Sequence, residues 1–346
     1  MKKEYTLEQQ FAVVALDGLS CIHHSAAKYA ALRGIAAAKY LEEILLWEED
    51  MPEAGEFQKK LEAGIAAVKD MKKKEMDAVE KETADLLLAD GGMEAVPDLL
   101  GCDMNYYTAG VSMKAYRSDR EIYQSIAESV RAEILEEGPV TMECACLLWL
   151  FRESGCMHDI FSVREQERVQ ERMIALGTAG ELSRKNAKTE DGRENDSREA
   201  AKGEDVGEGK QQKAEDGGQE LTDADYISMI WNQEFHRGRE QAVKSFLKGK
   251  RELFKNPYLE GVNLLFPFLD RRQAIFVDFV IFGTKVKDRR RMMMEFLVGR
   301  GHSVEEIKSG TETLLRIDNA YYRIWPKTVS SGRVPIQGAS LLPVYR

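Results

Sequence analysis

The sequence lacks several signatures that would assign it to a common functional class. No apolar run is long and uncharged enough to span a bilayer, and the start Met1-Lys2-Lys3 leads into an acidic, alternating segment instead of a signal-peptide core. It contains no glycine-rich phosphate loop, no Gly-x-Ser-x-Gly and no His-Glu-x-x-His. We therefore expect a cytoplasmic protein without a cofactor that is not an enzyme.

Cysteine is scarce and is not arranged for metal binding or disulfides. The five cysteines are an odd number, are widely spaced and form no Cys-x-x-Cys pair, which is typical of reduced, buried thiols. Cys144 and Cys146 are two positions apart on a predicted helix, so their side chains diverge. Cys21, His23 and His24 have no second ligand group at zinc-finger spacing. We expect no metal site.

Aromatic residues are absent from residues 178–221, and large apolar side chains are nearly absent there. Glycine, serine and charged residues dominate this stretch, so it cannot bury enough apolar surface to offset the cost of ordering its backbone. The composition predicts a disordered acidic linker over 178–221. It would separate an N-terminal domain, 1–177, from a C-terminal domain, 222–346.

The two halves differ in charge. The chain carries 49 Lys and Arg against 59 Asp and Glu, a net charge of −10. From Asp223 to the end we count 21 basic and 14 acidic residues, or +7, which leaves 28 and 45, or −17, before it. A basic half of this kind favours anionic partners, although solvated helix faces also explain such charge runs.

Apolar periodicity predicts helices through most of the N-terminal domain. They fall within 6–17, 25–47, 54–89, 119–137 and 162–176. The stretch from Pro139 to Gly155 is apolar on nearly every side and is typical of a helix buried all round, with Pro139 in its first turn and Gly155 closing it. Residues 93–107 combine turn formers with short apolar pieces, which suits a hairpin or an exposed loop.

The C-terminal domain has a mixed pattern. A helix capped near Thr222 opens it, 275–282 is either strand or helix, 289–298 is helical, and Ser303 with Glu306 is typical of another helix start. Residues 314–325 are β-prone around a central Asp-Asn pair, as in a hairpin, and 341–345 suit a further strand. The predicted fold is mainly α: an N-terminal helical bundle with a short β-hairpin, the linker, and a smaller α+β domain.

Three stretches in residues 5–176 resemble the Golgi phosphoprotein 3 family. They are the opening helix Thr6 to Asp17, the Leu-Arg-Gly helix from Ala31 to Leu41, and the buried helix, turn and charged helix from Pro139 to Leu176. In eukaryotes these mainly helical proteins bind phosphatidylinositol 4-phosphate and the tails of Golgi glycosyltransferases. The resemblance therefore implies a peripheral membrane protein with anionic phospholipid headgroups, and protein tails, as partners.

The resemblance also implies which residues hold the headgroup. Arg33 matches the arginine of the Leu-Arg-Gly element, His24 falls near the position of an aromatic residue, and Lys81 falls near that of a later basic pair. The cluster Lys72, Lys73 and Lys74 would lie nearby if the helices pack as in the family. The apolar hairpin residues that dip into the bilayer would correspond to Val96, Leu99 and Leu100.

Other hypotheses remain open at this point. Arg33 could instead form a structural ion pair, and the hairpin could be a packing element. The basic C-terminal domain, with helices followed by an aromatic hairpin, suits a winged-helix-like nucleic-acid module. A third hypothesis is an enzyme whose carboxylates are scattered through the sequence.

Overall fold

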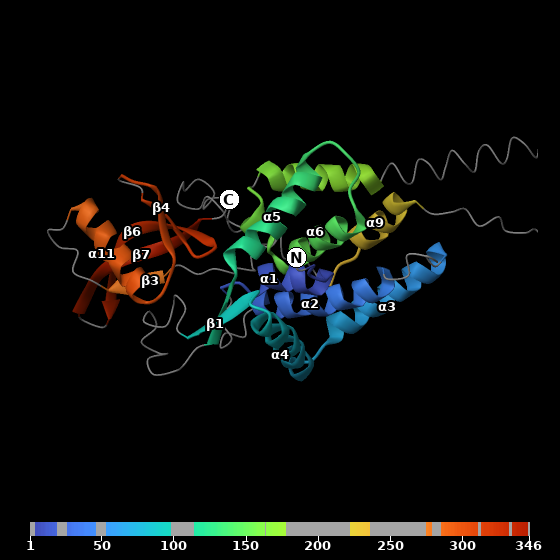
Figure 1. The fold of residues 1–346 in the computed structure, drawn as a ribbon, viewed down its shortest axis with the longest axis horizontal. Helices are drawn as coiled ribbons and strands as arrows, with labels where there is room; N and C mark the ends of the chain where they lie inside the picture. The colour runs from blue at the N-terminus through green and yellow to red at the C-terminus, as the bar shows by residue number, and fades with distance from the viewer. Residues whose placement is uncertain are drawn as a thin grey trace, which may run out of the picture.

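The computed structural model describes residues 4–18, 26–45, 53–97, 114–162, 164–177, 222–235, 275–278, 285–310, 313–331 and 334–344. The described chain is mainly helical, with an antiparallel sheet near the C-terminus (Figure 1). The predicted disordered linker, 178–221, lies outside the described residues.

Helices make up most of the N-terminal half. They are α1 (Leu7–Ala15), α2 (Ala26–Leu45), α3 (Ala54–Asp70), α4 (Lys73–Ala89), α5 (Arg120–Leu135), α6 (Met142–Ser154), α7 (Met157–Ile160), the helix at 164–177, and α9 (Asp223–Trp231). The strands β1 (Met93–Pro97) and β2 (Lys114–Ser118) pair antiparallel within this half. The first lies in the stretch 93–107 that was predicted as a hairpin or exposed loop, and the second lies beyond it. Together these elements form the helical domain.

Side-chain caps set several of the helix ends. Thr6 and Gln9 form a reciprocal capping box at the start of α1, and the Asp119 carboxylate accepts from two backbone N–H groups at the start of α5. Gly155 closes α6 with φ 76°, a left-handed conformation that favours glycine. The cap at Gly155 agrees with the signal read from the sequence.

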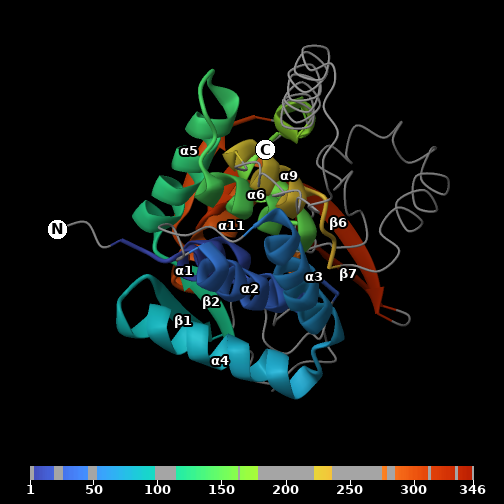
Figure 2. The ribbon, with the colours of Figure 1, turned by 90° about the vertical axis from the view of Figure 1, so that its right-hand side faces the viewer.

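Helix α6 is the centre of the helical domain. Every residue from Cys144 to Ser154 is buried, as predicted for this stretch, and α1, α2, α5 and α9 pack around it (Figures 1 and 2). Trp149 and Phe151 are completely inaccessible to solvent. A helix apolar on all sides can lie only where neighbours cover each side, so α6 fixes the positions of the others.

Two glycines allow close helix packing beside α2. A Cβ on Gly34 would stand 2.5 Å from the Phe11 ring of α1, and a Cβ on Gly64 of α3 would stand 2.0 Å from the Tyr40 ring. Tyr40 also donates a hydrogen bond to the Lys60 carbonyl at 2.6 Å. The region 54–89, predicted as generally helical, is divided at Met71 and Lys72 into α3 and α4.

Helix α9 belongs to the helical core although 178–221 separates it from the preceding helices. Tyr226, Ile227, Ile230, Trp231 and Phe235 are all buried in the same apolar cluster as α6. The helical domain therefore includes residues 222–235, in contrast to the predicted boundary at residue 222. The sequence pattern located the helix but could not show which core its apolar face would join.

A second, smaller apolar core lies between a helix and a sheet. The strands β3 (Ile275–Asp278), β4 (Val304–Lys308), β5 (Leu314–Ile317), β6 (Ala320–Ser331) and β7 (Val334–Val344) form one antiparallel sheet in the order β3-β7-β6-β5-β4. Met293 and Leu297 of α11 (Val286–Gly299) pack on Leu315, Ile317 and Leu341. We call α11 and these strands the sheet domain.

The sheet domain confirms one sequence prediction and corrects another. The hairpin around Asp318 and Asn319 is present as β5 and β6, with Asp318 at φ 53°. Ser303 and Glu306, predicted to start a helix, instead lead into and lie on strand β4. Val304 and Glu306 are half-buried and Glu305 is exposed, which is the alternation of a strand with one face on α11.

A polar junction joins the two domains. Arg117 of β2 donates to the Gly301 carbonyl at 2.7 Å and to Asp318 at 3.3 Å. The Asn319 side-chain amide donates to Asp17 at 3.1 Å and to the Ser118 carbonyl at 3.2 Å. The β5–β6 turn thus rests on the base of the β1–β2 hairpin.

Candidate anion-binding surface

Arg33 lies on α2 between residues of the apolar core. Leu32 and Ile35 are fully buried, whereas Arg33 is half-buried. Its Nε is inaccessible to solvent and has no hydrogen-bond partner, and no carboxylate of the described residues lies within ion-pair distance of its guanidinium. The structural ion pair that was the alternative role of Arg33 is thus absent from the described part of the chain.

Most other arginines in the helical domain are paired. Arg131 makes two hydrogen bonds to Glu165, at 2.7 and 3.0 Å, and Arg152 pairs with Glu153 at 3.0 Å. The hydrogen bonds from Arg131 are the main reason that the pKa of Glu165 is lowered to about 2. Arg33 differs from these groups because its buried Nε–H has no acceptor, which costs about 1–3 kcal/mol.

The four predicted lysines lie on α4 or at its start. Lys72, Lys73, Lys74 and Lys81 are exposed, and Lys74 and Lys81 are seven positions apart, so they share one side of the helix. Among the described residues none of the four forms an ion pair. Asp77 and Asp85 are exposed on the same side, so this side of α4 carries charges of both signs.

Helices α2 and α4 are linked by two ion pairs. The buried ammonium of Lys28 lies 2.8 Å from Glu80, and the exposed Lys39 lies 2.8 Å from Glu82. The hydrogen bond to Glu82 is the largest cause of a raised pKa for Lys39. The buried Lys28–Glu80 pair holds the helix that carries Arg33 against the helix that carries the lysines, whereas the exposed Lys39–Glu82 pair contributes little. No direct contact joins Arg33 to the lysines.

The remaining predicted residues are only partly described. Val96 is half-buried on β1, opposite Ala115 of β2. His24, Leu99 and Leu100 lie outside the described residues. The structure therefore places the base of the hairpin and leaves the predicted membrane-contact residues beyond Val96 untested.

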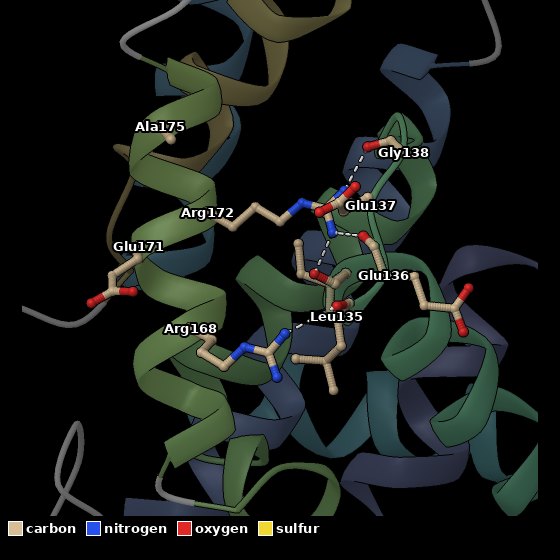
Figure 3. Close-up of a pocket in the computed structure, with 9 residues that line it drawn as sticks. Leu135, Glu136, Glu137, Gly138, Arg168, Glu171, Arg172 and Ala175 are labelled. Atoms are coloured by element: carbon tan, nitrogen blue, oxygen red, sulfur yellow. Dashed lines mark hydrogen bonds between the residues drawn. The ribbon is translucent and has the colours of Figure 1, made fainter.

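An open hollow of about 550 Å³ lies between the helix at 164–177 and the α5–α6 connection. Figure 3 shows Arg168 and Arg172 pointing across it toward backbone carbonyls. Arg172 donates to the carbonyls of Ile134 and Gly138, at 2.6 and 2.5 Å, and Arg168 to that of Leu135 at 3.2 Å. Since α5 ends here, these arginines donate hydrogen bonds to carbonyls at its C-terminal end. We therefore interpret them as a helix cap and not as a ligand site.

In the part of the chain that the structure describes, no group of three or more metal-ligating side chains is assembled. Cys144, Cys146 and Cys156 are buried thiols that form no disulfide, and burial raises the pKa of the Cys144 and Cys146 thiols. Cys21 and Cys102 lie outside the described residues.

Sequence reasoning missed a buried polar cluster at the end of α6. Trp149 and Arg152 both donate to the Gln233 carbonyl at 2.9 Å, and the Phe235 N–H donates to Glu153 at 3.2 Å. This cluster binds the segment that follows α9. The adjacent Arg152-Glu153 pair inside an otherwise apolar helix was a signal, because a buried charge pair requires nearby partners.

No match was found when the chain was compared with protein-family models, with curated proteins and with solved structures. Among the described residues, no helix combines the length and the apolar character needed to cross a bilayer.

Proposed function

We propose that the protein is a non-enzymatic peripheral membrane adaptor that binds anionic phospholipid headgroups through Arg33. The observation that carries the proposal is the half-buried guanidinium of Arg33, whose Nε has no acceptor and which pairs with no described carboxylate. A planar guanidinium held by its helix is suited to a phosphate, because two N–H groups can bond two oxygens at once.

The neighbouring elements support the same role. The exposed lysines at 72–74 and Lys81 on the adjacent helix supply long-range attraction to an anionic surface, at about 1 kcal/mol for each cation near it. The β1–β2 hairpin, which carries Val96 and leads to Leu99 and Leu100, supplies apolar residues for shallow insertion. Recognition of protein tails, implied by the family resemblance, belongs to the same adaptor role.

A vesicle flotation assay tests the proposal. Wild-type protein is expected to float with vesicles containing phosphatidylserine and a phosphomonoester headgroup lipid, and to stay at the bottom with neutral phosphatidylcholine vesicles. Arg33→Ala should lower the floating fraction several-fold. Inorganic phosphate added as a competitor separates recognition of the headgroup from general attraction to the anionic surface. Phosphate should release protein that is bound through the headgroup, but not protein that is held by surface charge alone.

Lys39→Ala provides the matched control. Lys39 is an exposed cation on the same helix, but Glu82 already neutralises it, so its removal should leave flotation unchanged. Equal flotation of wild type and Arg33→Ala, or no flotation with any anionic vesicle, would remove the proposal.

A further inference from the structure

The sheet domain has a face that α11 does not cover, and its composition differs from that of the covered face. Along β6, Tyr322 and Ile324 belong to the core under α11. Because side chains alternate along a strand, Tyr321, Arg323 and Trp325 lie on the opposite face. Trp325 is 42% exposed, which is unusual for so large an apolar side chain.

Strand pairing extends this face across three strands. Arg316 of β5 lies directly opposite Tyr321, and Leu314 of β5 and Leu342 of β7 flank Arg323 on its two sides. Ser340 of β7 lies opposite Trp325. The result is a sheet face on which an arginine separates two aromatic rings along β6, with Leu314, Leu342 and the buried Ser340 beside them.

The charge of the domain is complementary to an anion. Residues 275–346 contain twelve Lys and Arg against seven Asp and Glu, whereas the whole chain is acidic. On this face Arg316 and Arg120 of the helical domain share the single carboxylate of Glu305, so the shared cluster keeps a net positive charge. A basic face on an acidic protein attracts a polyanion locally, in a manner that depends on salt.

We infer that this face of the sheet binds single-stranded nucleic acid, with Tyr321 and Trp325 stacking on bases and Arg323 contacting the phosphates between them. Residues two apart on a strand are separated by about 6.5–7 Å, so Tyr321 and Trp325, four positions apart, stand about 13 Å apart. This spacing suits stacking on two bases of an extended strand that have one nucleotide between them. Stacking on aromatic side chains with arginine between them is the usual chemistry of single-strand platforms. This inference does not depend on lipid binding by Arg33.

The same geometry disfavours the other anionic partners. A broad sheet face does not enter the major groove of a duplex, although β6 and β7 continue past the other strands as a two-stranded ribbon. Shallow membrane insertion requires protruding apolar residues, whereas Trp325 on this face is flanked along β6 by Arg323. The winged-helix arrangement suggested by the sequence differs from the observed antiparallel sheet covered by α11.

Fluorescence anisotropy with the full-length protein and a labelled oligodeoxythymidine of about 15 nucleotides tests the inference. Trp325→Ala should weaken binding at least about fivefold, while Trp325→Phe keeps most of the affinity. Arg323→Gln should reduce the slope of log affinity against log salt by about 0.7. Arg291→Ala is the control: this exposed arginine lies on α11, across the sheet, and should change neither quantity.

Several outcomes would overturn the inference. They are no binding of the oligonucleotide, binding that neither Trp325→Ala nor Arg323→Gln changes, and equal affinity for a duplex of the same sequence. Loss of vesicle binding in Trp325→Ala without oligonucleotide binding by wild type would assign the face to lipid instead. Circular dichroism of each variant confirms that the sheet is intact.

Discussion

The guanidinium carbon of Arg152 lies 4.2 Å from the centroid of the Trp231 ring, so a residue at the end of α6 contacts one at the end of α9. The two residues are separated in sequence by 178–221, and both are buried. Contacts of a cation with a desolvated indole stabilise by up to about 2 kcal/mol. The chain thus returns after this stretch to complete the helical core.

Replacing Trp231 with alanine should destabilise the helical domain strongly. The change removes a buried indole, its contact with Arg152 and apolar surface next to Phe235, at an expected cost of about 3–5 kcal/mol. Urea unfolding followed by circular dichroism measures this cost. Met229→Ala, on the same helix but half-buried, should cost distinctly less; equal small effects would mean that α9 does not complete the core.

Two glycines of α3 should respond oppositely to alanine. A Cβ at Gly64 would overlap the Tyr40 ring, so Gly64→Ala should lower the melting temperature by several degrees. A Cβ at Gly55 meets nothing within 4 Å, so Gly55→Ala should raise stability by about 0.5–1 kcal/mol because alanine favours the helix. Differential scanning fluorimetry compares them, and a stable Gly64→Ala would contradict the observed α2–α3 packing.

The Arg131–Glu165 pair predicts a dependence of stability on pH. The pKa of Glu165 is lowered from 4.5 to about 2, so its contribution is fully present above pH 4.5 and is lost as pH falls through about 2. The stability difference between wild type and Glu165→Gln should therefore shrink between those pH values. Glu128→Gln, which removes an exposed carboxylate 3.9 Å from Arg131, should show no comparable trend.

The polar junction predicts that domain docking is sensitive to one arginine. Arg117→Ala removes the hydrogen bond to the Gly301 carbonyl and the ion pair to Asp318. Amide hydrogen exchange at 301–305 and 317–320 should then accelerate, whereas Arg291→Ala leaves these amides unchanged. Burial acts to raise the pKa of Asp318, but hydrogen bonds from His302 and Ser303 and the charge of Arg117 hold it below its usual value. Unchanged exchange in Arg117→Ala would show that the junction contributes little.

The sequence predicted the local structure of the helices better than it predicted which helices and strands pack together. Helix caps at Thr6, Asp119 and Gly155 involve residues within a few positions, and the all-round apolar character of α6 requires burial wherever its partners come from. The sequence could not show which of the two apolar cores α9 joins, because an apolar helix face fits either one. Strand β4 was taken for a helix start because Ser303 with Glu306 matches a capping box, and pairing with β5 overrode that local preference.

The candidate site shows the same division. The family resemblance singled out Arg33 through the Leu-Arg-Gly element, but its unpaired Nε depends on which side chains of other helices lie nearby. The opposite face of the sheet was not foreseen either. Its arginine and aromatic residues alternate with core residues along β6, and strand register decides which of them share a face.

In the role that we propose, Arg33 provides the bond to an anionic headgroup, and a vesicle titration of three proteins tests the claim. The dissociation constant for vesicles with a phosphomonoester headgroup lipid should rise at least about tenfold in Arg33→Ala, partially recover in Arg33→Lys, and stay at the wild-type value in Lys39→Ala. The same dissociation constant for wild type and Arg33→Ala would contradict the claim.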